Sequence, residues 1–167
     1  MTRGSIAAVA LLFTFAAWPV HAGRADAITS ANESSAIVSL KAISTAQMNY
    51  RLTCGNGAYA ASLVVLRTPP GKVGDGFIDA SLGSSAKPEK SGFIFSVTPA
   101  AGSNKGPADC NGTPTVTNFY ATAVPVSAKT GTRSFALNQN DVIWTQKGSK
   151  APTEPFGPPA QQIAIKK

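Results

Sequence analysis

Few residues in this sequence are of the types that carry out enzyme chemistry. His21 is the only histidine, so a histidine general base or a serine–histidine pair would depend on one residue near the N-terminus. Asp75 and Asp79 are the closest carboxylates expected in one local structure. Such a pair could serve a hydrolase or bind calcium, but the stretch lacks the spacing of an EF-hand loop. The sequence therefore predicts a protein that is not an enzyme, with no catalytic, metal or cofactor site.

The two cysteines, Cys54 and Cys110, are expected to form a disulfide. A single pair in an exported chain usually does so, and closing the long loop between them would contribute about 4 kcal/mol to stability. Two free thiols are the alternative. The pair is too far apart in the sequence, and too poor in partner ligands, to suggest zinc.

The N-terminus resembles an export signal. Arg3 precedes an apolar run over residues 6–20, and Val20, His21 and Ala22 fit a small-x-small cleavage site. We therefore expect residues 1–22 to be a signal peptide and the protein to be periplasmic or extracellular. A retained anchor, or a degenerate pilin leader, is the alternative, and only then is contact with a membrane expected. A composition of 43% apolar and 14% charged residues agrees with an exported, folded domain.

The positive charge is dispersed along the sequence. The chain has 15 basic and 8 acidic residues, a formal net charge of +7, but no dense basic run. A nucleic-acid surface normally clusters such residues, so nucleic acid is not the favoured partner. Lys129 and Arg133 lie next to a predicted hairpin with aromatic residues, and they are our candidate interaction surface.

Residues 29–50 give the best helix pattern in the chain. Ser30 and Glu33 match a capping box at its start. Apolar residues recur at helical spacing along one stripe, whose members are Ala36, Ile37, Leu40, Ile43, Ala46, Gln47 and Tyr50. Such a helix must bury one face against another element.

The second half of the sequence predicts strands. Residues 92–98 and 116–124 are aromatic and β-branched, and residues 134–137 and 142–145 flank a hairpin turn. A helix followed by such strands predicts an α+β fold, with the helix packed on a small antiparallel sheet over residues 28–146. Residues 59–66 and 77–82 are expected to form short helical turns. Residues 147–167, rich in proline and lysine, are expected to be a flexible tail.

The order of these segments resembles a known family. Residues 31–50 resemble the later part of the long helix in type IV pilin-like and type II secretion pseudopilin-like proteins. Residues 57–63 are similar to the segment after that helix, residues 90–95 to the first strand, and residues 130–144 to the closing hairpin. The resemblance covers roughly residues 30–145 and implies a pilin-like head domain.

The resemblance also implies a function. It suggests a structural or assembly protein that acts by protein–protein contacts with other pilin-like or secretion-apparatus subunits. The alternative is a soluble exported module on the same scaffold that binds a polysaccharide, an anionic surface or DNA.

Overall fold

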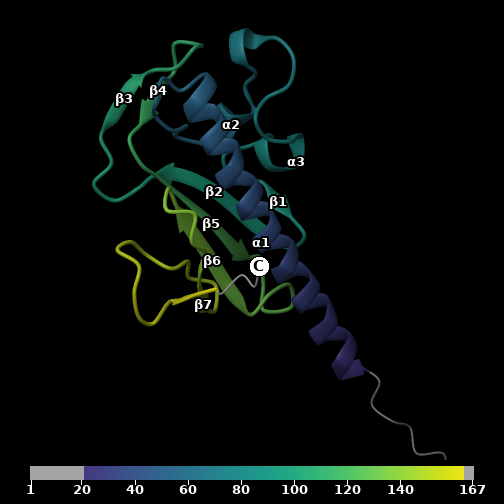
Figure 1. Cartoon of the computed structure of the whole chain (residues 1–167). Helices are drawn as coiled ribbons and strands as arrows, with labels where there is room; N and C mark the ends of the chain where they lie inside the picture. Colours follow the sequence, from purple (N-terminus) through teal and green to yellow (C-terminus); the bar gives the residue numbers. More distant parts are fainter. Residues whose placement is uncertain (1–20, 164–167) are drawn as a thin grey trace, which may run out of the picture.

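The long helix α1 (His21–Thr53) dominates the structure, a computed structural model that describes residues 21–163 (Figure 1). The expected helix over residues 29–50 is present, and it extends further at both ends. Ser30 and Glu33 therefore lie inside the helix, so the predicted capping box is wrong. The helix continues towards the N-terminus because no proline interrupts residues 23–29, which include two alanines. The expected signal peptide lies outside the described residues, except that its last two residues begin α1.

Three short helical segments follow α1. They are α2 (Leu63–Arg67), the 3-10 turn η1 (Pro70–Lys72) and α3 (Ala80–Gly83). Ser62 caps α2 by accepting from the backbone N–H of Val65, and Asp79 caps α3 by accepting from that of Leu82. The expected helical turns over 59–66 and 77–82 are thus shorter than predicted. Tyr59 instead makes an isolated β-bridge with Val116.

The main sheet has six strands, all antiparallel, in the order β1-β2-β5-β6-β7-β8. Its long strands match the predicted ones, and its shortest strands form the two edges. The strands are β1 (Glu89–Lys90), β2 (Phe93–Pro99), β5 (Phe119–Pro125), β6 (Arg133–Asn138), β7 (Trp144–Lys147) and β8 (Gln161–Gln162). The fold is therefore α+β, as the sequence predicts.

A second, two-stranded sheet, which the sequence did not predict, forms between β2 and β5. It pairs β3 (Lys105–Ala108) with β4 (Pro114–Val116). The turn between these strands carries Cys110, which forms the predicted disulfide with Cys54 just beyond α1. The disulfide thus fastens the C-terminal end of α1 to this hairpin.

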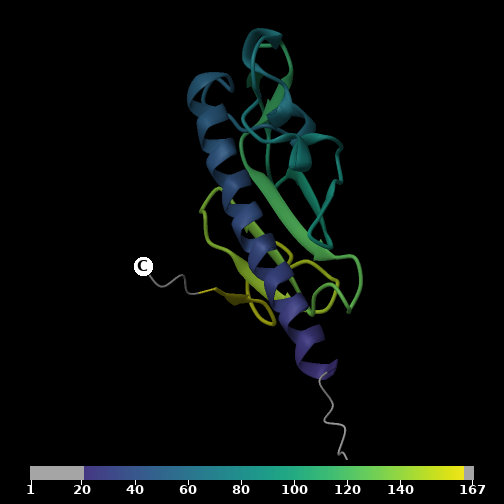
Figure 2. The ribbon, with the colours of Figure 1, turned by 90° about the vertical axis from the view of Figure 1, so that its right-hand side faces the viewer.

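The core lies between α1 and the inner face of the main sheet. In Figure 2, α1 forms one layer and the strands form a second layer beside it. Every second residue of β2, β5 and β6 contributes its side chain to this core, as expected for strands. β6 is also buried on its other face. The largest fully buried side chains come from both layers: Leu40, Ile43, Tyr50, Phe93, Phe95, Phe119, Phe135 and Leu137.

The C-terminal segment packs on the sheet, so the expected flexible tail is wrong for residues 148–163. β8 pairs with β7, and Phe156 stacks on Trp144 with ring centroids 5.4 Å apart. The Tyr120 hydroxyl donates to the carbonyl of Pro152. These contacts lie on the sheet face turned away from α1, because Tyr120 and Trp144 alternate with core residues along their strands.

Candidate functional site

One face of α1 stays uncovered along the domain. Its exposed side chains recur at intervals of three and four residues, which places them in one line opposite the buried face. Val38 is 68% exposed and Leu52 is 75% exposed. All eight members are uncharged, and most are small or apolar: Ala27, Ala31, Ser34, Val38, Ala42, Thr45, Asn49 and Leu52. We call these eight residues the outer stripe.

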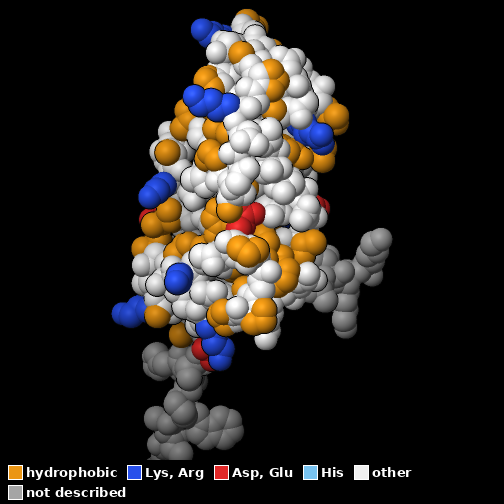
Figure 3. Space-filling view, turned by 90° about the vertical axis from the view of Figure 1, so that its left-hand side faces the viewer, with side chains coloured by type: hydrophobic (Ala, Val, Ile, Leu, Met, Phe, Trp, Pro, Cys, Tyr) orange, Lys and Arg blue, Asp and Glu red, His pale blue; other side chains and the backbone are white. Residues whose placement is uncertain are grey.

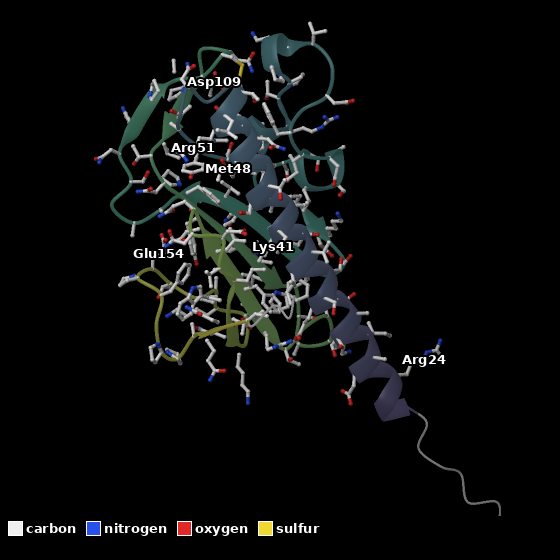
Figure 4. The ribbon with its side chains drawn as sticks, viewed as in Figure 1. Arg24, Lys41, Met48, Arg51, Asp109 and Glu154 are labelled. Carbon is white, nitrogen blue, oxygen red and sulfur yellow. A yellow bond between two sulfur atoms is a disulfide. The ribbon has the colours of Figure 1, made fainter. Side chains whose placement is uncertain are left out.

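The charged side chains of this part of α1 are held away from the outer stripe. Glu33 is buried against the domain. Lys41 reaches Asp141, with 2.9 Å between Nζ and Oδ2. Arg51 donates to the carbonyl of Gly57 and lies over the Tyr59 ring. Figure 4 shows Lys41 and Arg51 beside α1 on the side of the strands. From Ala27 to Leu52 the stripe carries no charged residue, whereas Arg24, three residues before Ala27 on the same line, is exposed.

The N-terminal turns of α1 extend past the end of the sheet (Figure 1). Residues 23–28 are all exposed, and they include the large apolar residue Ile28, which is 52% exposed. Glu33 is the first buried side chain among the described residues of the helix. In the sequence, the apolar run over residues 6–20 comes directly before α1. The outer stripe thus begins on a part of the helix that the domain does not cover.

Glu33 anchors α1 to the loop before β6. One carboxylate oxygen accepts from the backbone N–H groups of Thr132 and Arg133 and from the Thr132 hydroxyl. The other accepts two bonds from the Arg133 guanidinium, at 2.9 and 2.7 Å. Asn32 adds a bond to the carbonyl of Thr130. Glu33 was predicted to cap the helix, and it instead connects the helix to the sheet.

The hydrogen bonds to Glu33 keep its carboxylate ionised. Burial alone would raise the pKa of Glu33, but the bonds from Thr132 and Arg133 outweigh it, so the pKa lies below its usual value. A buried charge of this kind lowers the stability of the fold little only while its hydrogen-bond partners stay in place. The contact between Glu33 and the start of β6 is therefore stable only while α1 and β6 are both in place.

The structure separates the roles of Lys129 and Arg133. Both lie at or near the loop before β6, but the Arg133 guanidinium is bound to Glu33, so it does not present a free charge to a partner. Lys129 is exposed. The Arg133 side chain is paired but still 43% exposed, so an interaction surface at these two residues stays a prediction.

The opposite end of α1 is fixed by a second polar contact beside the disulfide. The buried Tyr50 hydroxyl donates to Asp109 at 2.8 Å. Asp109 also accepts from the backbone N–H groups of Asn111 and Thr113. Burial, and then the charge of Asp109, raise the pKa of Tyr50. Asp109, next to Cys110, thus organises the turn that carries the disulfide.

Asp75 and Asp79 line the same surface hollow, next to Arg67. Asp79 accepts from Ser81 and from the backbone of Leu82, and it lies 3.9 Å from Lys90. The bond from Ser81 is the largest cause that lowers the pKa of Asp79. Asp79 therefore serves as a helix cap. Within residues 21–163, no group of three His, Cys, Asp or Glu side chains is arranged to hold a metal ion.

Sequence reasoning missed the outer stripe. The apolar periodicity from Ala36 to Tyr50 identifies the buried face of the helix, and it gives no signal for the opposite face. The signal in the sequence that indicates the outer stripe is a run of uncharged positions at the same helical spacing.

No helix in the described part of the chain has the length and apolar character needed to cross a membrane.

Comparison with known proteins gave no relative. No protein-family model, curated protein or solved structure matches this chain.

Proposed function

We propose that this chain is a pilin-like structural or assembly protein of a type IV pilus or type II secretion-type apparatus. It is exported to the cell envelope and acts by protein–protein contacts. The observation that carries the proposal is the uncharged outer stripe on a helix that extends past its own domain. The resemblance of residues 30–145 to the pilin-like family supports it.

The outer stripe has the properties of a surface for packing another helix. Its members recur every three or four residues, the spacing that lets two helices pack at a small angle. The small side chains of Ala27, Ala31 and Ala42 allow a close approach, and Val38 and Leu52 supply apolar area. A solvated helix face normally carries charged residues, and this one carries none between Ala27 and Leu52.

The partner expected from this geometry is α1 of another copy, or of a related subunit. The apolar run over residues 6–20 would reinforce such packing if it is retained, whether in a membrane or among the helices of an assembly. The sheet, the β3–β4 hairpin and the C-terminal segment would then form the outer surface of that assembly.

Binding of DNA or of an anionic surface has less support. Figure 3 shows Lys and Arg side chains spaced singly over one face, without a basic cluster. Phosphate recognition depends on several cations acting together.

The test is self-association of the full chain. Val38→Glu places a charge in the middle of the outer stripe, and we expect it to weaken self-association at least tenfold in sedimentation equilibrium. Thr98→Glu, an exposed position on the opposite face of the sheet, is the matched control and should behave as the unchanged protein. The proposal fails if the unchanged chain stays monomeric, or if both variants weaken association equally.

A further inference from the structure

A hollow lies between the C-terminal segment and strands β6 and β7. Its volume is about 550 Å³, within the range of small-molecule sites. Residues from three parts of the chain line it, principally Asn138, Asn140, Trp144, Glu154, Phe156 and Gln162. We call it the C-terminal pocket. Figure 4 shows Glu154 on the C-terminal loop, away from α1, so the pocket is separate from the outer stripe.

An aromatic wall forms one side of the C-terminal pocket. Trp144 and Phe156 stack nearly parallel, with an interplanar angle of 15°. Tyr120 lies behind them, with its ring centroid 6.2 Å from that of Phe156. The Tyr120 hydroxyl is bonded to Pro152, and burial, together with the charge of Glu154, raises its pKa to about 12. Tyr120 thus stays neutral and holds the loop that presents Phe156.

Hydrogen bonds hold two polar side chains of the pocket, Asn138 and Glu154, in position. Asn138 donates to Glu154 at 2.7 Å, and its side-chain oxygen accepts from the backbone N–H of Asn140. The second oxygen of Glu154 accepts from the backbone N–H of Ala101 at 2.9 Å. Each carboxylate oxygen therefore keeps a further lone pair for another donor. The amide side chains of Asn140 and Gln162 are on exposed residues at the rim.

From this arrangement we propose that the C-terminal pocket binds a neutral saccharide. The C–H face of a sugar ring packs on the negatively polarised face or edge of an aromatic wall. Neighbouring hydroxyl groups, which are both donors and acceptors, match planar amides and a carboxylate. Groups held rigidly before binding lose little conformational entropy on complex formation. This inference does not rest on the proposed assembly role.

The charge of the pocket disfavours other ligands. Among the described residues that line it, Glu154 is the only charged one, and its charge disfavours phosphate and sulfate groups. A sugar, which can use one wall and several hydrogen bonds, fits better.

Trp144 provides the means of testing the proposal. The sequence has two tryptophans, Trp18 and Trp144, so in the full chain carrying Trp18→Phe the indole emission reports on the pocket alone. The probes are cellotetraose, maltotetraose, laminaritetraose and chitotetraose, with choline and inorganic phosphate as charged probes. We expect a saturable change in emission with at least one tetrasaccharide, and none with phosphate.

Matched variants locate the site. Gln162→Ala and Asn140→Ala should each weaken saccharide binding about fivefold to tenfold, the usual effect of one lost hydrogen bond. Gln161→Ala is the control, because Gln161 is the neighbouring residue on β8 and its side chain lines a different hollow, next to Arg133. Its affinity should equal that of the unchanged protein.

Three results would overturn the proposal. They are no saturable change with any tetrasaccharide, binding of choline in place of the sugars, and saccharide binding that is equally strong in the Gln162→Ala, Asn140→Ala and Gln161→Ala variants. None of these variants is expected to unfold the protein, since the three side chains lie on exposed residues.

Discussion

Glu33 shows how one buried charge can determine where a helix lies. Its carboxylate receives five hydrogen bonds from Thr132 and Arg133. A surface ion pair contributes little to stability, but here the Glu33 side chain is only 7% exposed. Loss of this one group would leave several donors without a partner.

The first prediction concerns that loss. Glu33→Gln removes the charge with little change in volume, and we expect it to lower the free energy of unfolding by about 2–4 kcal/mol. Urea unfolding followed by circular dichroism measures this directly. Glu89→Gln is the control, because Glu89 is exposed, and it should change stability by less than about 0.5 kcal/mol. Equal effects of the two substitutions would contradict the anchoring role.

The lowered pKa of Glu33 also leads us to expect that the stability of the protein depends on pH. The pKa of Glu33 is lowered in the folded state, so its contribution is fully present above the unfolded-state pKa, near 4.5. That contribution is lost as the pH falls through the folded-state value. We therefore expect the stability difference between the unchanged protein and Glu33→Gln to shrink as the pH is lowered from about 5 to about 3. Urea titrations at several pH values test this, and a constant difference would rule it out.

At the scale of elements, the sequence predicted the helix and the strands whose residues repeat with a local period. The helical stripe from Ala36 to Tyr50 and the aromatic strands β2 and β5 follow from periodicity alone. The capping box at Ser30 was wrong because Ala25 and Ala27 let the helix continue, and a capping motif has no effect inside a helix. The β3–β4 hairpin was missed because its glycine and proline residues hide the alternation of a strand.

The C-terminal segment was missed for a different reason. Its proline-rich composition is typical of mobile chains, and its packing depends on distant partners. Phe156 meets Trp144 and Tyr120, and Glu154 meets Asn138 and Ala101. No pattern within residues 148–163 reveals those contacts. The C-terminal pocket could not be predicted for the same reason.

The packing of this segment leads to a third prediction. Phe156→Ala removes the aromatic contact with Trp144, and we expect a loss of stability of about 2 kcal/mol from the lost apolar burial. Thermal unfolding followed by circular dichroism measures the change. Phe156→Leu, which retains most of the apolar volume, should lose less stability than Phe156→Ala. Unchanged stability in Phe156→Ala would mean that the segment is the mobile tail that the sequence suggested.

The disulfide is the second device that fixes an element. It joins the end of α1 to the β3–β4 hairpin, next to the contact between Tyr50 and Asp109. We expect Cys54→Ser with Cys110→Ser to lower the free energy of unfolding by about 4 kcal/mol, chiefly because the unfolded chain gains freedom. Denaturant unfolding measures the loss. Reductant should destabilise the unchanged protein and have no effect on the double variant. Equal stability of the two proteins would argue against the disulfide.

At the scale of the molecule, α1 has two faces with different purposes. The buried face holds the sheet through apolar contacts and through Glu33. Most of the outer stripe is directed away from the rest of the described chain, while Thr45 and Asn49 also line a surface hollow with Tyr59 and Phe119. Because the helix is anchored by Glu33 and by the disulfide beyond its C-terminal end, the part of the stripe between these two anchors, from Ser34 to Leu52, is a rigid surface. A rigid surface loses little entropy on association.

The most direct test of the central proposal is cross-linking at the outer stripe. Both native cysteines are in the disulfide, so Val38→Cys in the full chain introduces a single reactive thiol. Treatment of the purified protein with a short bis-maleimide, at a concentration where it self-associates, should yield a covalent dimer. Thr98→Cys should yield little. A dimer from Val38→Cys alone would place a second α1 against the stripe. No dimer from Val38→Cys, or equal yields at both positions, would contradict the claim that this helix packs against another copy of itself.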